Sequence, residues 1–382
     1  MRFYLTVLSP LAVGACSVVP DLPRIPIVPD HGEVRTVEIQ NFIGRIEISE
    51  SRYFKVDSRT LAFAEMRGRD VVVAGTDDPG EVGCQVVEDK LLLDRPAPDA
   101  EIRINERAGQ SDLSDLPLIR ILAGGRNIRL VVRNSVLFGE TGDLAEANIA
   151  LRGCSRLDTG DIDEAVVNLS ESAKIDMDDT HALTAELVGF GYLTTERIES
   201  GRLRVTDQAQ LAADHLRNAG VRLDARGKLR VGRMEAVGLT LDQTAEARAD
   251  AAYGRLEAVM QGTTVLDIED GDLATLELDV AGRSEASYSG STSEAKLVAS
   301  GSGLLIVHEV RDHFDALATD RSEIRIDRDP DLLATSRIVL PSMGRVLRGV
   351  RRLLPIPGGV RGKSPETPEP LAPTAPAPSP SR

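Results

Sequence analysis

The chain has 382 residues, a formal net charge of −15, 3% aromatic residues and no tryptophan. Nucleic acid is excluded as an expected partner of so acidic a protein, because phosphate binding requires a basic face. The low aromatic content favours a thin core of aliphatic side chains, and the length allows one or two domains.

Residues 1–15 resemble an export signal, because Arg2 precedes a mostly apolar stretch from Phe3 to Leu8. The segment Leu11-Ala12-Val13-Gly14-Ala15-Cys16 is similar to the lipobox of bacterial lipoproteins, which implies that Cys16 becomes the lipidated first residue. Cleavage after Ala15 by an ordinary signal peptidase is the alternative. Both predict export to the cell envelope. By resemblance to other lipoproteins, Ser17 favours the outer membrane, with the periplasm as the other location.

Two further cysteines, Cys84 and Cys154, are the candidates for a disulfide, because an exported protein folds in an oxidising compartment. A buried free thiol at Cys154 is the alternative. No metal site is expected at either position, since neither has a second cysteine or a histidine nearby.

Residues 16–32 predict an extended spacer, with prolines at positions 20, 23, 26 and 29. Residues 33–140 then alternate as short strands and predict an irregular β lead-in that merges into the region after it. The strand candidates lie within Glu33–Asp57, Asp70–Ala74, Cys84–Leu93, Glu101–Ile104, Pro117–Ala123 and Asn127–Val132.

An 18-residue repeat marks the region 141–308. Seven units begin at Ala147, Ala165, Leu183, Gly201, Ala219, Val237 and Arg255. The fifth position is apolar in every unit: Leu151, Leu169, Leu187, Val205, Leu223, Leu241 and Val259. The eleventh position is apolar as well: Leu157, Ile175, Leu193, Leu211, Leu229, Ala247 and Val265. The third position is apolar in six units, with Glu257 as the exception.

These columns predict an all-β fold, a right-handed parallel β-solenoid with 18-residue turns. Positions 3 and 5 alternate with polar neighbours, as in strands that have one face inward, and a fixed period stacks equivalent positions on one another. No proline interrupts residues 118–329, which suits strands paired on both sides. Ordinary hairpins are the alternative, although they require no strict period. A left-handed hexapeptide helix fits less well, because position 17 is mostly polar.

The repeat changes register after Asp272, where Leu276 and Leu278 carry on the third and fifth positions one residue late. The unit that begins at Ala295 resumes the pattern. We expect an outward loop around Ser289–Ser293 to explain this slip.

Residues 309–340 are expected to form a small helical C-terminal cap. His308–Asp320 has apolar residues at helical spacing, and Glu323–Asp327 is expected to be a last strand. A cap is required because the end of a solenoid exposes unpaired backbone groups.

Residues 341–354 predict a basic amphipathic helix, and the Pro-rich residues 355–382 predict a disordered tail. The helix would place Arg345, Arg348, Arg351 and Arg352 against an anionic membrane surface. Its alternative role is to pack on the acidic rod.

Several motifs resemble those of the auto-transporter adhesin head GIN domain family, over residues 33–308. They are Leu118-Ile119-Arg120-Ile121-Leu122, Gly142-Asp143-Leu144, Tyr288-Ser289-Gly290 after Gly282, and Ser300-Gly301-Ser302-Gly303. The resemblance implies an exported bacterial protein with a β-solenoid fold and no assigned catalytic residues.

Three acidic clusters are the candidates for enzyme chemistry. They comprise Asp176, Asp178 and Asp179 near His181; Asp267, Glu269, Asp270 and Asp272; and Asp312-His313-Phe314-Asp315. None has a recognised catalytic spacing, and the five histidines form no nucleophile or zinc arrangement. We therefore expect no catalytic residue, no metal and no cofactor.

Two classes of function follow. The preferred one is a non-catalytic cell-envelope protein, a lipid-anchored solenoid that acts in adhesion, surface binding or envelope structure. Its partners would be a polysaccharide or an envelope protein, and the membrane through the lipid anchor. The alternative is a carbohydrate-active enzyme, a polysaccharide lyase or hydrolase, on the same scaffold.

Overall fold

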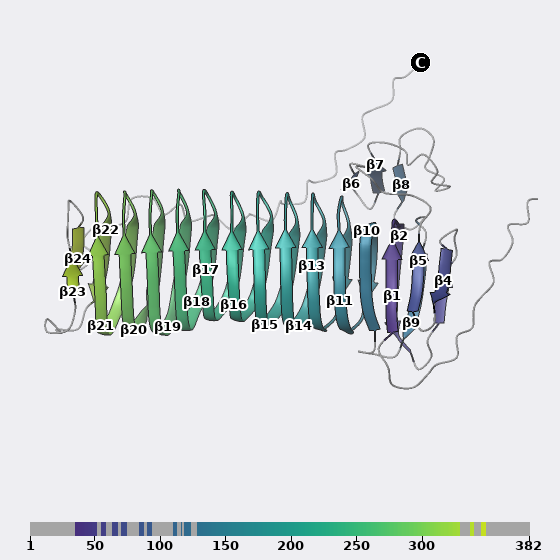
Figure 1. Ribbon diagram of the computed structural model, residues 1–382, viewed down its shortest axis with the longest axis horizontal. Helices are drawn as coiled ribbons and strands as arrows, with labels where there is room; N and C mark the ends of the chain where they lie inside the picture. The colour runs from purple at the N-terminus through teal and green to yellow at the C-terminus, as the bar shows by residue number, and fades with distance from the viewer. Residues whose placement is uncertain are drawn as a thin grey trace, which may run out of the picture.

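The computed structural model describes residues 35–51, 55–58, 63–67, 70–74, 84–87, 90–93, 110–112, 116, 118–123, 128–328, 337–339 and 345–348. All regular structure in these residues is β-strand, and the strands stack as coils along one straight rod (Figure 1). In Figure 1 the near strands run upward while the chain advances from right to left, so the solenoid is right-handed. The predicted parallel β-solenoid is confirmed.

The body of the rod runs from β10 to β21. Its first coils contain β10 (Ile128–Thr141), β11 (Leu144–Leu151), β12 (Arg156–Thr159) and β13 (Ile162–Leu169). The later coils each contain one long bent strand: β14 (Lys174–Leu187), β15 (Tyr192–Val205), β16 (Gln210–Leu223), β17 (Lys228–Leu241), β18 (Glu246–Met260), β19 (Val265–Val280), β20 (Glu285–Ala299) and β21 (Leu304–Ala318). Each of these strands pairs in parallel with the equivalent strand of the next coil.

The predicted columns form the core. Leu151 pairs with Leu169, and Leu169 pairs with Leu187, each 18 residues further along the chain. All three side chains are at most 2% exposed. Inward and outward residues alternate along each strand. Each coil therefore adds its inward aliphatic side chains to the columns of the core and leaves polar side chains outside.

The seventh predicted unit is wrong by one residue. Glu235 pairs with Tyr253 but Val237 pairs with Leu256, so a β-bulge adds one residue to this coil. Ala258 and Met260 therefore take the third and fifth positions in place of Glu257 and Val259. Leu266 likewise replaces Val265, which is 38% exposed.

The next correction concerns Leu276 and Leu278, which take the first and third positions of their coil, with Val280 at the fifth. No loop protrudes at residues 289–293, because β20 continues through them and the extra residues are absorbed as bulges within the strands. The longer coils enclose Tyr288 and Phe314, both 1% exposed.

One corner of every coil from residue 153 to residue 320 has the same backbone conformation. One residue per coil has a positive φ between 56° and 92°: Gly153, Glu171, Gly189, Asp207, Ala225, Gln243, Gly262, Gly282, Gly301 and Asp320. From Glu171 onward, the residue that follows each positive-φ residue donates its N–H to a carbonyl oxygen, that of the positive-φ residue in the preceding coil. Phe190 N–H, for example, donates to the Glu171 carbonyl oxygen at 2.6 Å. We call this row the left-handed corner.

The N-terminal lead-in is a coil plus a cap. The first coil contains β1 (Arg35–Gln40) and β2 (Ile43–Glu50), which pair with β10. Beyond it, β5 (Asp70–Ala74) pairs with β1 and β9 (Leu118–Ala123) pairs with β2. The antiparallel strands β4 (Phe63–Arg67) and β3 (Lys55–Ser58) then pair with β5 and β9.

The chain between the first two coils therefore folds back over the N-terminal end of the rod. Within this excursion, β6 (Cys84–Val87), β7 (Lys90–Leu93) and β8 (Gln110–Asp112) form a separate antiparallel sheet. The strand expected at Glu101–Ile104 lies outside the described residues.

The predicted helical cap at the C-terminal end is wrong. The segment His308–Asp320 lies largely within β21. A bulge between Val310 and Phe314 interrupts the alternation of inward and outward residues, and this interruption produced the apolar spacing that resembled a helix. The rod continues as β22 (Glu323–Arg328), β23 (Arg337–Val339) and β24 (Arg345–Arg348).

The described part of the predicted basic helix is also a strand. Residues of β24 pair in parallel with β22, from Glu323 with Arg345 to Ile326 with Arg348. Arg351, Arg352 and the tail 355–382 lie outside the described residues.

Candidate functional site

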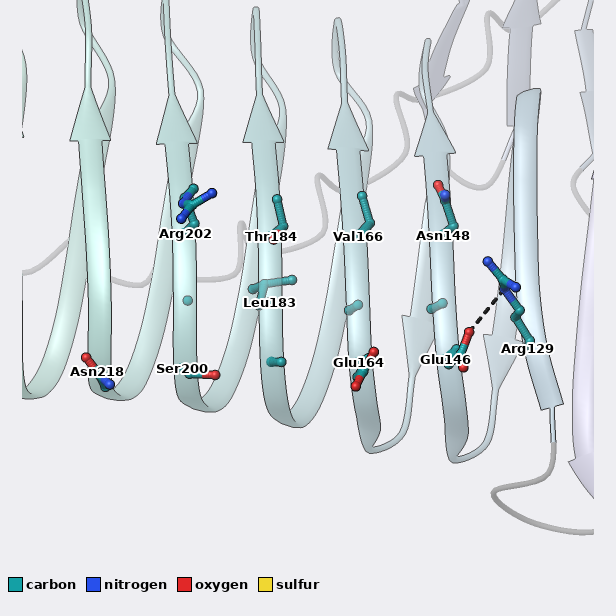
Figure 2. A pocket seen from close by; sticks show the side chains of 14 residues that line it. Arg129, Glu146, Asn148, Glu164, Val166, Leu183, Thr184, Ser200, Arg202 and Asn218 are labelled. Carbon is teal, nitrogen blue, oxygen red and sulfur yellow. Dashed lines mark ion pairs between the residues drawn. The ribbon is translucent and has the colours of Figure 1, made fainter. Parts of the chain in front are cut away.

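A shallow groove of about 550 Å³ crosses successive coils on one side of the rod (Figure 2). One row of lining residues is in register from coil to coil: Arg129, Glu146, Glu164, Ala182, Ser200 and Asn218. The other row contains Asn148, Val166, Thr184 and Arg202. Each row is in strict register from coil to coil, so the groove runs parallel to the rod axis.

Small residues form the floor between the two rows. Ala147, Ala165 and Gly201 lie at the first position of their coils, which also carries Leu183. The side chains of Ala147, Ala165 and Leu183 are buried and Gly201 has none, so the strand backbone itself is the bottom of the groove. This backbone is already hydrogen-bonded between coils and offers few free donors or acceptors.

The groove has no net charge, although the protein is acidic. Its charged lining residues are two arginines and two glutamates, and Arg129 Nε lies 3.2 Å from Glu146 Oε2. The other polar groups are the amides of Asn148 and Asn218 and the hydroxyls of Thr184 and Ser200. Amides and hydroxyls both donate and accept hydrogen bonds, so this surface suits an uncharged polar ligand.

Sequence reasoning did not identify these groove residues. Part of their signal was the short side chain at outward positions next to the first column, at Asn148, Ala182, Thr184, Ser200 and Asn218. A second hollow of about 280 Å³ lies beside the groove and is lined by residues that include Asn168, Ser170 and Glu186.

The first acidic cluster lies on a different part of the rod surface. Asp176 pairs in register with Asp158, and both are exposed. Partial burial and the negative charge of Asp158 raise the pKa of Asp176. Partial burial and several neighbouring aspartates, Asp161 first, raise the pKa of Asp178.

Three of the remaining acidic candidates, Asp179, Asp272 and Asp315, each form a separate contact. Asp179 Oδ2 lies 3.2 Å from Arg197 Nη1. Asp272 forms an ion pair with Arg311. His313 Nε2 lies 3.7 Å from Asp315 Oδ1, while Phe314 between them points into the core. Among the residues that the structure describes, no three metal-binding side chains gather as a site.

Charged side chains also pair between coils. Arg217 Nη1 donates to Glu199 Oε2 at 2.9 Å and lowers the pKa of this carboxyl. Arg233 stacks over Tyr253, 4.3 Å from the ring centre. The pair of Arg217 with Glu199 neutralises an acidic residue of the neighbouring coil, and it is exposed enough to contribute little to stability.

The structure describes the side chain of one of the two cysteines in the predicted disulfide. Cys154 is buried at the left-handed corner and is disulfide-bonded. The alternative of a free thiol at this position is therefore wrong. The side chain of Cys84 and the whole of Cys16 lie outside the described part, so the pairing and the lipidation stay predictions.

The other predicted surface residues lie at the C-terminal end. Arg345 is exposed on β24, next to Val346, which packs against the core. Within the described ranges, no helix is long and apolar enough to span a membrane.

Comparisons of the chain with protein-family models, with curated proteins and with solved structures found no match.

Proposed function

We propose that this protein is a non-catalytic, exported component of the cell envelope that binds a ligand along the side of its solenoid. The groove carries this proposal, because it is an extended polar surface without net charge, built from coils in register. Pre-formed grooves with a few polar groups are typical of binding sites.

Two further observations support export. The lipobox-like segment ends at Cys16, and Cys154 is in a disulfide, which is typical of proteins that fold outside the cytosol. The resemblance to the GIN domain family points in the same direction. In this proposal Cys16 carries the lipid anchor, and the rod projects from the membrane after the spacer 17–32.

Mass spectrometry of the mature protein from fractionated cells tests this location. We expect a membrane fraction whose N-terminal residue is a lipidated Cys16. An unprocessed chain that begins at Met1 and remains in the cytosol would contradict the proposal.

We keep a carbohydrate-active enzyme as the second candidate. The observation in its favour is that Asp176 and Asp178 have raised pKa values on one face, since perturbed carboxyl groups are frequent at catalytic sites. Turnover assays on polyuronides would decide between the two. Cleavage that is lost in Asp176→Asn or Asp178→Asn would establish the enzyme, whereas we expect no cleavage by the unaltered protein.

The C-terminal arginines are proposed to contact an anionic membrane surface, now from a strand instead of a helix. Arg345 and Leu347 are exposed side by side on β24. A peptide of residues 338–363 should bind anionic vesicles more strongly than neutral ones. Equal and negligible binding to both would remove this contact.

A further inference from the structure

We propose that the groove binds an uncharged, linear polysaccharide laid parallel to the rod axis. This inference rests on the proposed binding function and specifies its ligand class. It starts from the length of the site. Adjacent coils are spaced by about 4.8 Å, so the row from Asn148 to Gly238 extends over about 24 Å. A ligand that fits must therefore be extended.

Two glycines lengthen the groove beyond its hollow part. Gly220 and Gly238 continue the row of Asn148, Val166, Thr184 and Arg202, in register with one another. A Cβ at either position would meet no atom within 4 Å, and neither has a positive φ. Packing and backbone conformation therefore do not require glycine here. A glycine within a strand is typical of places where a ligand approaches the backbone closely.

The polar groups of the groove match hydroxyl groups. Asn148 and Asn218 offer amides on coils at either side of Thr184. Ser200 Oγ donates to the His181 carbonyl oxygen at 2.9 Å and keeps lone pairs that can accept a hydrogen bond. Val166 is 41% exposed and provides an apolar contact for the C–H face of a sugar ring.

The charges disfavour an anionic polymer. Recognition of carboxylates or phosphates requires arginines or lysines in excess. Here Arg129 is paired with Glu146, and Arg202 is balanced by Glu164 in the same lining.

The backbone disfavours a polypeptide. Peptides that bind β-sheets add a strand to a free edge, where N–H and C=O groups are unpaired. The groove lies on a sheet face whose strands pair with neighbours on both sides. A peptide across the coils would meet no such groups.

Affinity electrophoresis of the full-length protein tests the proposal. The probes are three neutral polysaccharides (dextran, galactomannan and arabinoxylan) and polygalacturonate as the anionic comparison. The test variant is Gly220→Arg, which places a long side chain on the row of Arg202, at a position where an added Cβ meets no atom within 4 Å. The matched control is Gln210→Arg, on an exposed position of the same strand β16. Both variants add the same charge, and equal thermal transitions would show that both fold.

We expect at least one neutral polymer to retard the unaltered protein, polygalacturonate not to do so, and Gly220→Arg to weaken binding at least tenfold while Gln210→Arg leaves it unchanged. Binding to no neutral polymer, stronger binding to polygalacturonate, or unchanged binding by Gly220→Arg would each overturn the inference. If one of these results is obtained and the protein is lipidated in the envelope, only the proposed ligand class is refuted. A cytosolic, unprocessed chain refutes the proposed function itself.

Discussion

The left-handed corner concentrates backbone strain in single residues. Five of its ten positive-φ positions carry a side chain, at Glu171, Asp207, Ala225, Gln243 and Asp320. Two of these side chains have a compensating role. Asp207 and Asp320 accept the N–H of Gly189 and Gly301 in the preceding coil, at 3.3 and 3.2 Å.

Ala225 has no side-chain polar atom, so glycine should be better there. Ala225→Gly is expected to raise the free energy of unfolding by about 1 kcal/mol, because it relieves the left-handed conformation. Urea denaturation measures this change. Ala212→Gly, in strand β16 without a positive φ, is the control and should lower stability. An equal loss in both variants would contradict the assigned corner.

The residue two positions after the left-handed one must be small. At Gly227, an added Cβ would lie 2.5 Å from the Val205 carbonyl oxygen of the coil before. Gly227→Ala should therefore lower the free energy of unfolding by about 2 kcal/mol, as overpacked positions do. Gly220→Ala, which meets nothing within 4 Å, should leave stability unchanged or raise it. Similar losses in both would refute the close coil contact.

Among the elements, the strands of the first six repeat units could be predicted from sequence, because their apolar columns have an unbroken period of 18. The seventh could not, since a bulge beside Tyr253 shifts every later column, and the neighbouring Val259 and Val265 are apolar enough to hide the shift. The sign of this shift in the sequence was Glu257, a charged residue at a third position that is apolar in the other units. The helical spacing of Val310, Phe314 and Leu317 misled for the same reason.

The candidate site was less predictable than the fold. Core columns carry a strong apolar signal, whereas the groove is made of short polar side chains that differ from coil to coil, from Asn148 to Thr184 and Asn218. Only coil stacking brings these residues, 18 apart in sequence, into one row. The acidic runs were conspicuous in sequence, but none of their residues lines the groove.

The carboxyl of Asp176 in strand β14 is expected to lower the free energy of unfolding in a pH-dependent way. Partial burial and then the negative charge of Asp158 raise the pKa of Asp176 above its ordinary value of 3.8, so the ionised carboxyl destabilises the fold as the pH rises above 3.8. Asp176→Asn should therefore add about 0.5 kcal/mol at pH 7, a typical cross-strand value. The gain should vanish as the pH falls below 3.8.

Thermal unfolding between pH 3 and pH 8 checks this dependence. Glu186→Gln serves as the comparison, because Glu186 lies 3.6 Å from Arg204 and its loss should not stabilise. A gain for Asp176→Asn that is independent of pH would speak against repulsion from Asp158.

At the scale of the whole molecule, both ends of the rod carry shorter strands than its body. β3, β4, β5 and β9 cover the first coil, and β22, β23 and β24 follow the last long strand. Short strands rich in charge reduce edge-to-edge association. The ends of β23 and β24 carry arginines, as expected of edge strands that resist association: Arg337, Arg345 and Arg348.

Removal of these last strands should expose the edge of β21. A chain that ends at Ala318 is expected to form higher oligomers in light scattering, relative to the full-length protein. A chain that ends at Gly362, which lacks only residues 363–382 of the Pro-rich tail, is the control and should keep the oligomeric state of the full-length protein. If the Ala318 chain kept the oligomeric state of the full-length protein, β22 to β24 would not act as a cap.

The stacking of coils underlies the core, the corner and the groove, and distances along one outward row test it directly. Ala150, Asn168, Glu186, Arg204, Arg222 and Thr240 occupy equivalent positions in six successive coils up to β17. Spin labels at residues 168 and 240 should be separated by about 19 Å, and labels at residues 150 and 240 by about 24 Å, when measured by electron paramagnetic resonance. An increase of about 4.8 Å per coil is the result that stacking predicts. Distances that do not rise steadily with the number of coils would contradict it.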